Sequence, residues 1–275
     1  MTYSMATVTP TSTLAASTAE VRLNSDSPIQ VPDGINNIVS AIPYYVPTAA
    51  FSPDESYVTR VRLSSNDISV EPCRFMMSGV NTGDAAFASV QAPILQEYSL
   101  NIPNANGANI NVYDQPMVNN TVLMLVGCEL VYSTGATGQQ QYWNTPDALS
   151  TGGTVINTRT TLNTITITDG REITSMNALV APTTAAASTH DVGEIEFQSS
   201  DFQVPFPYSF PIAPSFSGLG AAAAQQTNPN GLSRQKFPAG HGVPLAPRAL
   251  INSFYTNRDA KGVGSSVMPF LSFTR

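Results

Sequence analysis

Strand-like segments recur along this chain of 275 residues, whereas segments with helical periodicity are hard to find. The run 57–63 alternates between apolar and polar side chains, which is the pattern of a strand with one buried face. This alternation predicts that Arg60 and Arg62 lie on the solvent-exposed face. The run 122–126 is apolar throughout, as expected of a strand that is covered on both sides. These patterns predict an all-β fold.

Strands are expected wherever apolar, β-branched and aromatic residues cluster between turn-forming residues. An Asp169-Gly170 turn closes the eighth of these segments. The expected strands cover residues 20–24, 39–46, 57–64, 70–77, 97–102, 109–113, 122–132, 160–168, 194–198 and 268–273. Phe270, Leu271 and Phe273 in the last of them, and Val267 just before it, need burial, so we expect this strand to be part of the core.

Only 11% of the residues are Asp, Glu, Lys or Arg, against ~25% in an ordinary soluble domain. The 12 Phe and 10 Tyr nevertheless supply enough apolar surface for a core. Interface cores are depleted in charge, so the composition predicts that much of the surface faces other protein. A secreted β-protein with a neutral polar surface is the alternative.

The formal net charge of −7 argues against general nucleic-acid binding through phosphate neutralisation. The charge is unevenly distributed, because residues 234–275 carry six basic side chains and one acidic one, a balance of +5. The first 233 residues carry −12. The basic region could dock onto an acidic surface of a neighbouring subunit or onto nucleic acid, or it could be an ordinary solvated segment.

Catalytic groups are scarce. The best-equipped segment contains His190, Glu194 and Glu196, which could share a metal ion on one strand face, although a solvated strand end is the favoured interpretation. His241 lies in a glycine-flanked turn and is expected at the surface. The sequence contains no Gly-x-Ser-x-Gly elbow and no glycine-rich phosphate loop. We therefore expect neither an enzyme nor a bound cofactor.

Two further features have alternative interpretations. Tyr142 and the single tryptophan, Trp143, stand together in a polar segment and could form a platform on which a sugar stacks, although a rim-buried structural role is the favoured interpretation. Cys73 and Cys128 lie in apolar surroundings, without the spacing of a metal or disulfide framework, and are expected to be buried free thiols. No window approaches ~18 uninterrupted apolar residues, so no transmembrane helix is expected.

The series of strands between residues 20 and 134, followed by a proline-rich segment after Gln203, resembles the jelly-roll major capsid proteins of icosahedral viruses and bacteriophages. The resemblance is architectural and rests on no diagnostic motif. It implies a jelly-roll β-sandwich or barrel, either a single jelly roll with an additional small β-domain or a double jelly roll. A faint echo between residues 21–32 and 195–205 would suit the double form.

On this interpretation the chain divides into an N-terminal arm (1–18), a jelly-roll β-domain (19–135), a second β-region (136–202), a Pro/Ala-rich loop or arm (203–247) and C-terminal strands (248–275). An ordered arm that packs across a neighbouring subunit is expected, with a disordered linker as the alternative. The expected assembly contacts are Phe206, Phe210, Phe216, Phe237, Arg258 and Lys261.

The resemblance implies a structural coat protein that self-assembles as trimers or hexagonal capsomers of an icosahedral shell. Its partners would be copies of itself and other capsid or penton proteins, its location the virion, and its place of synthesis the host cytoplasm. Residues 1–20 contain no basic side chain, unlike the arms of many capsid proteins that package RNA. This difference is typical of shells that surround an internal membrane or a separately condensed genome, so no strong direct nucleic-acid binding is expected. The alternative function is a carbohydrate-binding β-sandwich, such as a spike or adhesin, that uses Tyr142 and Trp143.

Overall fold

The structure is a computed structural model that describes the greater part of the chain. The described residues are 5–8, 19–24, 28–47, 56–80, 97–117, 124–135, 138–153, 155–182, 189–190, 193–202, 207–212, 215–216, 232–237, 241–258 and 265–275. Within them every regular element is a β-strand, and the paired strands run antiparallel, so the predicted all-β class is confirmed. The described part of the chain contains no helix long and apolar enough to cross a membrane.

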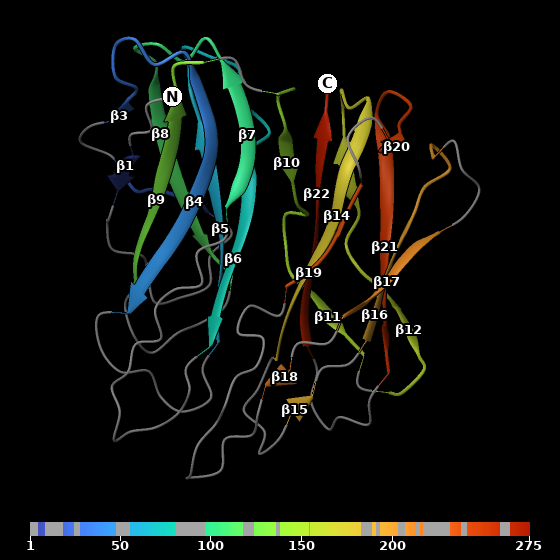
Figure 1. Ribbon diagram of the computed structural model, residues 1–275. Helices are drawn as coiled ribbons and strands as arrows, with labels where there is room; N and C mark the ends of the chain where they lie inside the picture. Colours follow the sequence, from blue (N-terminus) through green and yellow to red (C-terminus); the bar gives the residue numbers. More distant parts are fainter. Residues whose placement is uncertain are drawn as a thin grey trace.

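The first half of the chain forms a sandwich of two sheets, at the left of Figure 1. Sheet I has the order β1-β9-β4-β7, with bounds β1 Met5–Val8, β9 Met124–Ser133, β4 Asn37–Pro47 and β7 Tyr98–Pro103. Sheet II has the order β2-β8-β5-β6, with β3 also paired to β8; the bounds are β2 Val21–Arg22, β3 Ile29–Gln30, β8 Asn109–Pro116, β5 Ser56–Ser64 and β6 Arg74–Val80.

The second half repeats this arrangement at the right of Figure 1. Sheet III has the order β10-β22-β14-β19, with β11 paired to β22 and β20 to β14; the bounds are β10 Tyr142–Asn144, β11 Ser150–Gly152, β22 Ser265–Thr274, β14 Glu172–Pro182, β19 Leu232–Lys236 and β20 Val243–Pro244. Sheet IV has the order β12-β21-β16-β17, with β13 paired to β21; the bounds are β12 Arg159–Thr161, β13 Ile165–Ile167, β21 Ala249–Asn257, β16 Gly193–Gln198 and β17 Tyr208–Ile212. A further short pair joins β15 Thr189–His190 to β18 Ser215–Phe216.

Both halves have the strand order of a jelly roll. Each half has eight successive strands if β2 and β3, β10 and β11, β12 and β13, and β19 and β20 each count as one interrupted strand and the separate short pair β15–β18 is set aside. In both, one sheet then contains strands 1-8-3-6 and the other strands 2-7-4-5, which is the arrangement that two nested Greek keys produce. The fold is therefore a double jelly roll, and the alternative of a single jelly roll with a small additional domain is wrong. The sequence echo does not reflect the duplication, because residue 21 lies on strand 2 of its half and residue 195 on strand 4 of the other.

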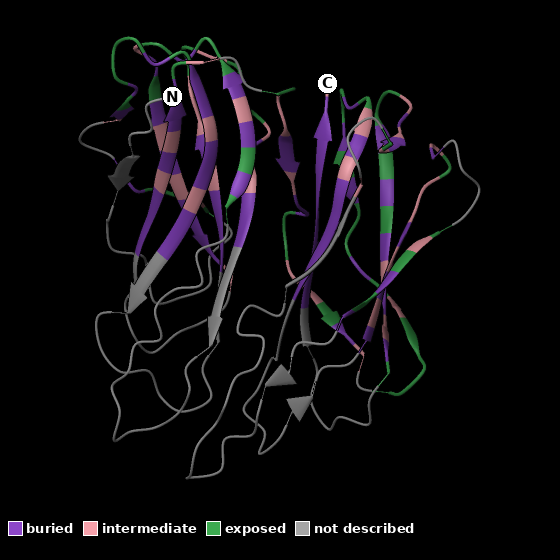
Figure 2. Cartoon of the chain, viewed as in Figure 1, coloured by how far each residue is buried: buried purple, intermediate pink, exposed green. Residues whose placement is uncertain are grey.

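Strand β22 is buried on both of its faces (Figure 2). Val267, Leu271 and Phe273 pack into the core between sheets III and IV. Met268 and Phe270 point the other way and belong to the core cluster of the first jelly roll. The expected burial of this terminal strand is confirmed, and its nearly continuous apolar sequence reflects a strand with protein on both sides.

Two local expectations differ from the structure. The strand expected over residues 160–168 is divided into β12 and β13, because residues 162–164 face only Asn252 and Ser253 of β21, and this extra residue interrupts the ladder. The described parts of the Pro/Ala-rich segment 203–247 pair within their own chain: β17 with β16, and β19 and β20 with β14. These parts are therefore edge strands of the second jelly roll.

We predict that truncation after Gly264 abolishes soluble folding, because it removes the strand that lies between β10 and β14 and that contributes to both cores. Removal of Arg275 alone, which follows β22, is the matched control and should leave a folded protein. Soluble yield and a cooperative thermal transition by circular dichroism are the measurements. A truncated chain that still melts cooperatively would contradict the central role of β22.

Candidate functional site: the junction between the two jelly rolls

The chain that connects the two jelly rolls runs along the open edges of the first one. The Gln141 amide donates to the Leu100 carbonyl of β7 at 2.7 Å, and the Trp143 amide donates to the Pro72 carbonyl at 3.2 Å. Cys73, immediately before β6, forms a parallel bridge with Trp143 in β10. The connection thus satisfies backbone groups that an exposed sheet edge would leave unpaired.

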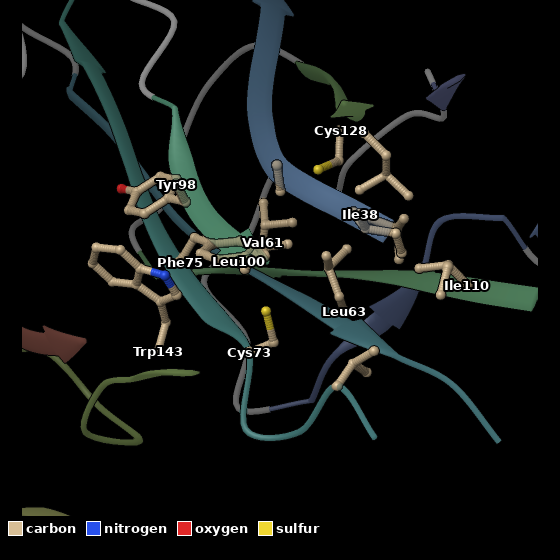
Figure 3. Close-up of a cluster of buried hydrophobic side chains, with 14 of the residues drawn as sticks. Ile38, Val61, Leu63, Cys73, Phe75, Tyr98, Leu100, Ile110, Cys128 and Trp143 are labelled. Carbon is tan, nitrogen blue, oxygen red and sulfur yellow. The ribbon is translucent and has the colours of Figure 1, made fainter. Parts of the chain in front are cut away.

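The side chain of Trp143 enters the core of the first jelly roll (Figure 3). It is 1% exposed, and its indole Nε1 donates to the Ser99 carbonyl at 2.8 Å. Its ring meets Tyr98 edge-on at a centroid distance of 4.9 Å and lies 6.1 Å from Phe270 of β22. Residues of the second jelly roll therefore complete the core of the first.

The favoured structural role of these two rings is confirmed and the sugar-stacking alternative is wrong, because both rings are buried. Tyr142 is buried in the core of the second jelly roll, stacked on Phe273 at 5.7 Å, and the Arg275 guanidinium lies over its ring at 4.4 Å. Trp143 faces the opposite core. Adjacent residues of a strand point to opposite faces, so β10 contributes one aromatic ring to each jelly roll.

A network of charged side chains lies beside this aromatic contact. Arg60 of β5 is only 5% exposed, so its predicted place on a solvent-exposed face is wrong. Its Nη1 donates to the Pro146 carbonyl at 3.0 Å and to Asp147 Oδ1 at 3.3 Å. Gln115 of β8 accepts a further hydrogen bond from its Nη2. The outward face of sheet II is covered here by the second jelly roll, which alternation within one strand could not reveal.

Neighbouring charges extend the network across the surface. Arg74 shares the Asp147 carboxylate with Arg60, at 3.0 Å. Arg62, which is partly buried, pairs with Glu20 at 2.6 Å and with Glu71 at 2.7 Å. Burial and the nearby Arg74 lower the pKa of Arg60, while Glu20 and Asp147 oppose that shift. The arrangement can fix the relative orientation of two rigid sandwiches, because each arginine fork accepts only a narrow range of geometries.

The expected assembly residues lie in different environments. Phe210 is buried in the core of the second jelly roll, and Phe237 packs against that core with its ring edge-on to Tyr208. Phe216 lies on β18, while Phe206 and Lys261 lie outside the described residues. Arg258 is exposed and pairs with Glu194 at 2.7 Å. Of the described side chains in this set, Arg258 is therefore the one that faces outward.

The metal-site hypothesis gains no support from the described residues. Glu194 pairs with Arg258 and Glu196 with Arg159, each at a distance typical of an ion pair. His190 lies on β15, paired with Ser215, and the described residues contain no group of three potential ligands. His241 is exposed, as expected. Cys73 and Cys128 are confirmed as buried free thiols, and burial raises the pKa of Cys128 to about 12.

Sequence reasoning missed the acceptors that hold Arg60. Pro146 and Asp147 stand more than eighty residues away in the chain, in a segment without strand character. A second buried polar group was also missed: Ser175 and Asn177 of β14 lie beside Ser272 of β22, on the face that packs against the first jelly roll. The sequence offered no signal for either group beyond polar residues within apolar surroundings.

No protein-family model matches the chain, and no curated protein matches it. Among solved structures, PNGase F, a glycosylasparaginase from Flavobacterium meningosepticum, aligns over 98% of this chain and 96% of its own, with 8% identity and a TM-score of 0.47. A chain from the Sulfolobus turreted icosahedral virus aligns over 99% and 90%, with 11% identity and a TM-score of 0.46. The major capsid protein P2 from bacteriophage PM2 aligns over 99% and 97%, with 12% identity and a TM-score of 0.38. These likenesses are architectural and say nothing of what this chain binds or does.

We predict that Trp143→Ala lowers the free energy of unfolding by about 3–5 kcal/mol, the range for truncating a large buried aromatic ring. Trp143→Phe is the matched control, which keeps most of the apolar volume but loses the hydrogen bond to Ser99, and should cost less. Denaturant unfolding followed by circular dichroism measures both. An alanine variant with the wild-type midpoint would contradict the role of this ring in the junction.

We also predict a pH-dependent contribution from Glu194. Hydrogen bonds from Arg258 and Ser209 hold the pKa of this carboxyl below its ordinary value. Its stabilising contribution is therefore present above the unfolded pKa of about 4.3 and is lost as the pH falls through the lower folded value. The stability difference between wild type and Glu194→Gln should shrink between pH 6 and pH 3 in denaturant titrations. A difference that stays constant over this range would contradict it.

Proposed function

We propose that this protein is a structural coat protein that assembles with copies of itself, as trimers or hexagonal capsomers, into a closed icosahedral shell. The proposal rests on the buried junction between the two jelly rolls. Trp143 and the Arg60 network join two jelly rolls so that one chain supplies two similar sandwiches in one fixed orientation. A rigid subunit with two similar sandwiches side by side suits a closed lattice, because the contacts between subunits must repeat at constant angles.

Composition supports the same proposal. With 11% charged residues, the chain offers surfaces that can be buried against other protein at little desolvation cost. The carboxylates Glu194 and Glu196, which would have to act in a catalytic site, are each engaged with an arginine. We therefore propose a structural role in the virion rather than an enzymatic one. Direct binding of nucleic acid is not part of the proposal, because the net charge is −7.

We predict that the purified protein self-associates into a species of at least three times the chain mass of 29.2 kDa, and that shell-like particles form at high concentration. Multi-angle light scattering gives the mass, and negative-stain electron microscopy identifies particles. A strictly monomeric protein at high concentration, with no particles, would overturn the proposed function.

A further inference from the structure

The two jelly rolls carry an aromatic residue at the same position of strand 7. In the first it is Tyr113 of β8, which lies opposite Arg62 of strand 4. In the second it is Phe254 of β21, which lies opposite Glu196 of strand 4. Arg62 and Glu196 are therefore structurally equivalent positions with opposite charge.

In each jelly roll an arginine lies over this aromatic ring and pairs with a glutamate. The arginine is on strand 4 in the first half, whereas the glutamate is on strand 4 in the second. In the first jelly roll, Arg62 lies over the Tyr113 ring at 4.1 Å and pairs with Glu20, which precedes strand 2. In the second, Arg159 of strand 2 lies over the Phe254 ring at 3.5 Å and pairs with Glu196. Two residues earlier on strand 4, Arg60 lies opposite Gln115 in the first jelly roll. At the equivalent position of the second jelly roll, Glu194 lies opposite Thr256. Strand 4 thus carries two arginines in one half and two glutamates in the other.

The two equivalent faces differ in what covers them. In the first jelly roll, the residues after β10 cover Arg60, through the Pro146 carbonyl and the Asp147 carboxylate. These residues lie between β10 and β11, where strand 1 of the other half is interrupted. In the second jelly roll, the Glu194 side chain remains 33% exposed and the side chain of its partner Arg258 44% exposed. The basic face is covered within the subunit, whereas the acidic face is open to solvent in the described structure.

A firmly held apolar loop borders the acidic face. Val155 and Ile156 are 62% and 47% exposed, which is unusual for two adjacent β-branched residues. The next residue fixes them to sheet IV, because the Asn157 amide donates to the Asn257 carbonyl at 2.7 Å. Arg258 donates to the Asn157 side chain at 3.0 Å while it pairs with Glu194. The apolar tip and the charged pair therefore form one preorganised surface, which we call the acidic patch: Val155, Ile156, Arg159, Glu194, Glu196 and Arg258.

We propose that the acidic patch docks a second copy of this chain, through the segment that follows strand β1 of that copy. Strand β1 is the structural equivalent of β10, since each is strand 1 of its half and pairs with strand 8. The pairing of each strand 1 with its strand 8 places Val8 at the position of Pro146, so Thr9 follows Val8 in the sequence as Asp147 follows Pro146. A neutral Thr9 thus replaces the aspartate that faces Arg60, and a neutral residue suits the acidic patch, whose two glutamates are already paired with Arg159 and Arg258.

This docking would repeat, between subunits, the contact that joins the two jelly rolls within one subunit. A contact between unlike surfaces is heterologous, and repetition of such a contact produces a ring when the rotation closes. The inference rests on the proposed function, because it assigns a surface and a partner segment to the self-assembly proposed above. The exchange of charge at strand 4 would also distinguish the two interfaces, since Asp147 pairs with Arg60 and Arg74, whereas Arg159 and Arg258 of the acidic patch are already paired with Glu196 and Glu194.

The test is a set of single substitutions measured by sedimentation velocity over a range of protein concentrations. Ile156→Asp places a charge on the exposed apolar tip and should weaken self-association at least tenfold, while the melting temperature stays at the wild-type value. Leu250→Asp is the matched control: Leu250 is 54% exposed on the same sheet, roughly 25 Å along β21 from Arg258, and should associate as wild type. Thr9→Asp introduces a carboxylate for which the patch has no arginine that is not already paired, so it should weaken association.

The outcomes separate this inference from the proposed function. If the wild-type chain assembles and Ile156→Asp assembles equally well, the acidic patch is not the interface, while the coat-protein proposal stands. If Ile156→Asp weakens association and Thr9→Asp does not, another segment of the second copy occupies the patch and the assigned occupant is overturned. A wild-type chain that stays monomeric overturns both proposals.

Discussion

The insertion of the Trp143 ring into a core made mostly by the other half of the chain is the contact on which the rest of the structure depends. It joins the edges of sheets I and II, and it brings β10 to the position where Tyr142 points back into the second core. Phe270 of β22 follows it into the same cluster. Because the first core contains residues from both halves, the two jelly rolls form one cooperative unit rather than two linked domains.

The charged network beside this contact adds orientation more than stability. Burial of Arg60 carries a desolvation cost that its partners only balance, and apolar residues of similar volume can stabilise such a site as well or better. A guanidinium held by Pro146, Asp147 and Gln115 nevertheless accepts one arrangement of the two sandwiches. Apolar packing alone would tolerate small rotations between them. A subunit that must meet its neighbours at constant angles gains from that restriction.

Sequence patterns identified the all-β class and most strands whose apolar residues alternate cleanly, such as β5. They missed β14 and β21, which are central strands of their sheets. On β21 the pattern is inverted, because Ser253 is buried while Leu250 is exposed. The burial of Arg60 was also beyond sequence reasoning, since it depends on contacts between segments far apart in the chain. Local periodicity describes a strand's own two faces but carries no information about which distant segment covers them.

The position of β22 has a consequence for how the polypeptide folds as it is synthesised. Domains of larger proteins commonly fold one after another as they leave the ribosome, the N-terminal one first. Here the first jelly roll cannot complete its core when β9 emerges, because Trp143, Met268 and Phe270 are still missing. Its apolar interior stays open to solvent until β22 has been translated. Newly made chains therefore pass through a long interval in which chaperones, or association with the wrong neighbour, compete with folding.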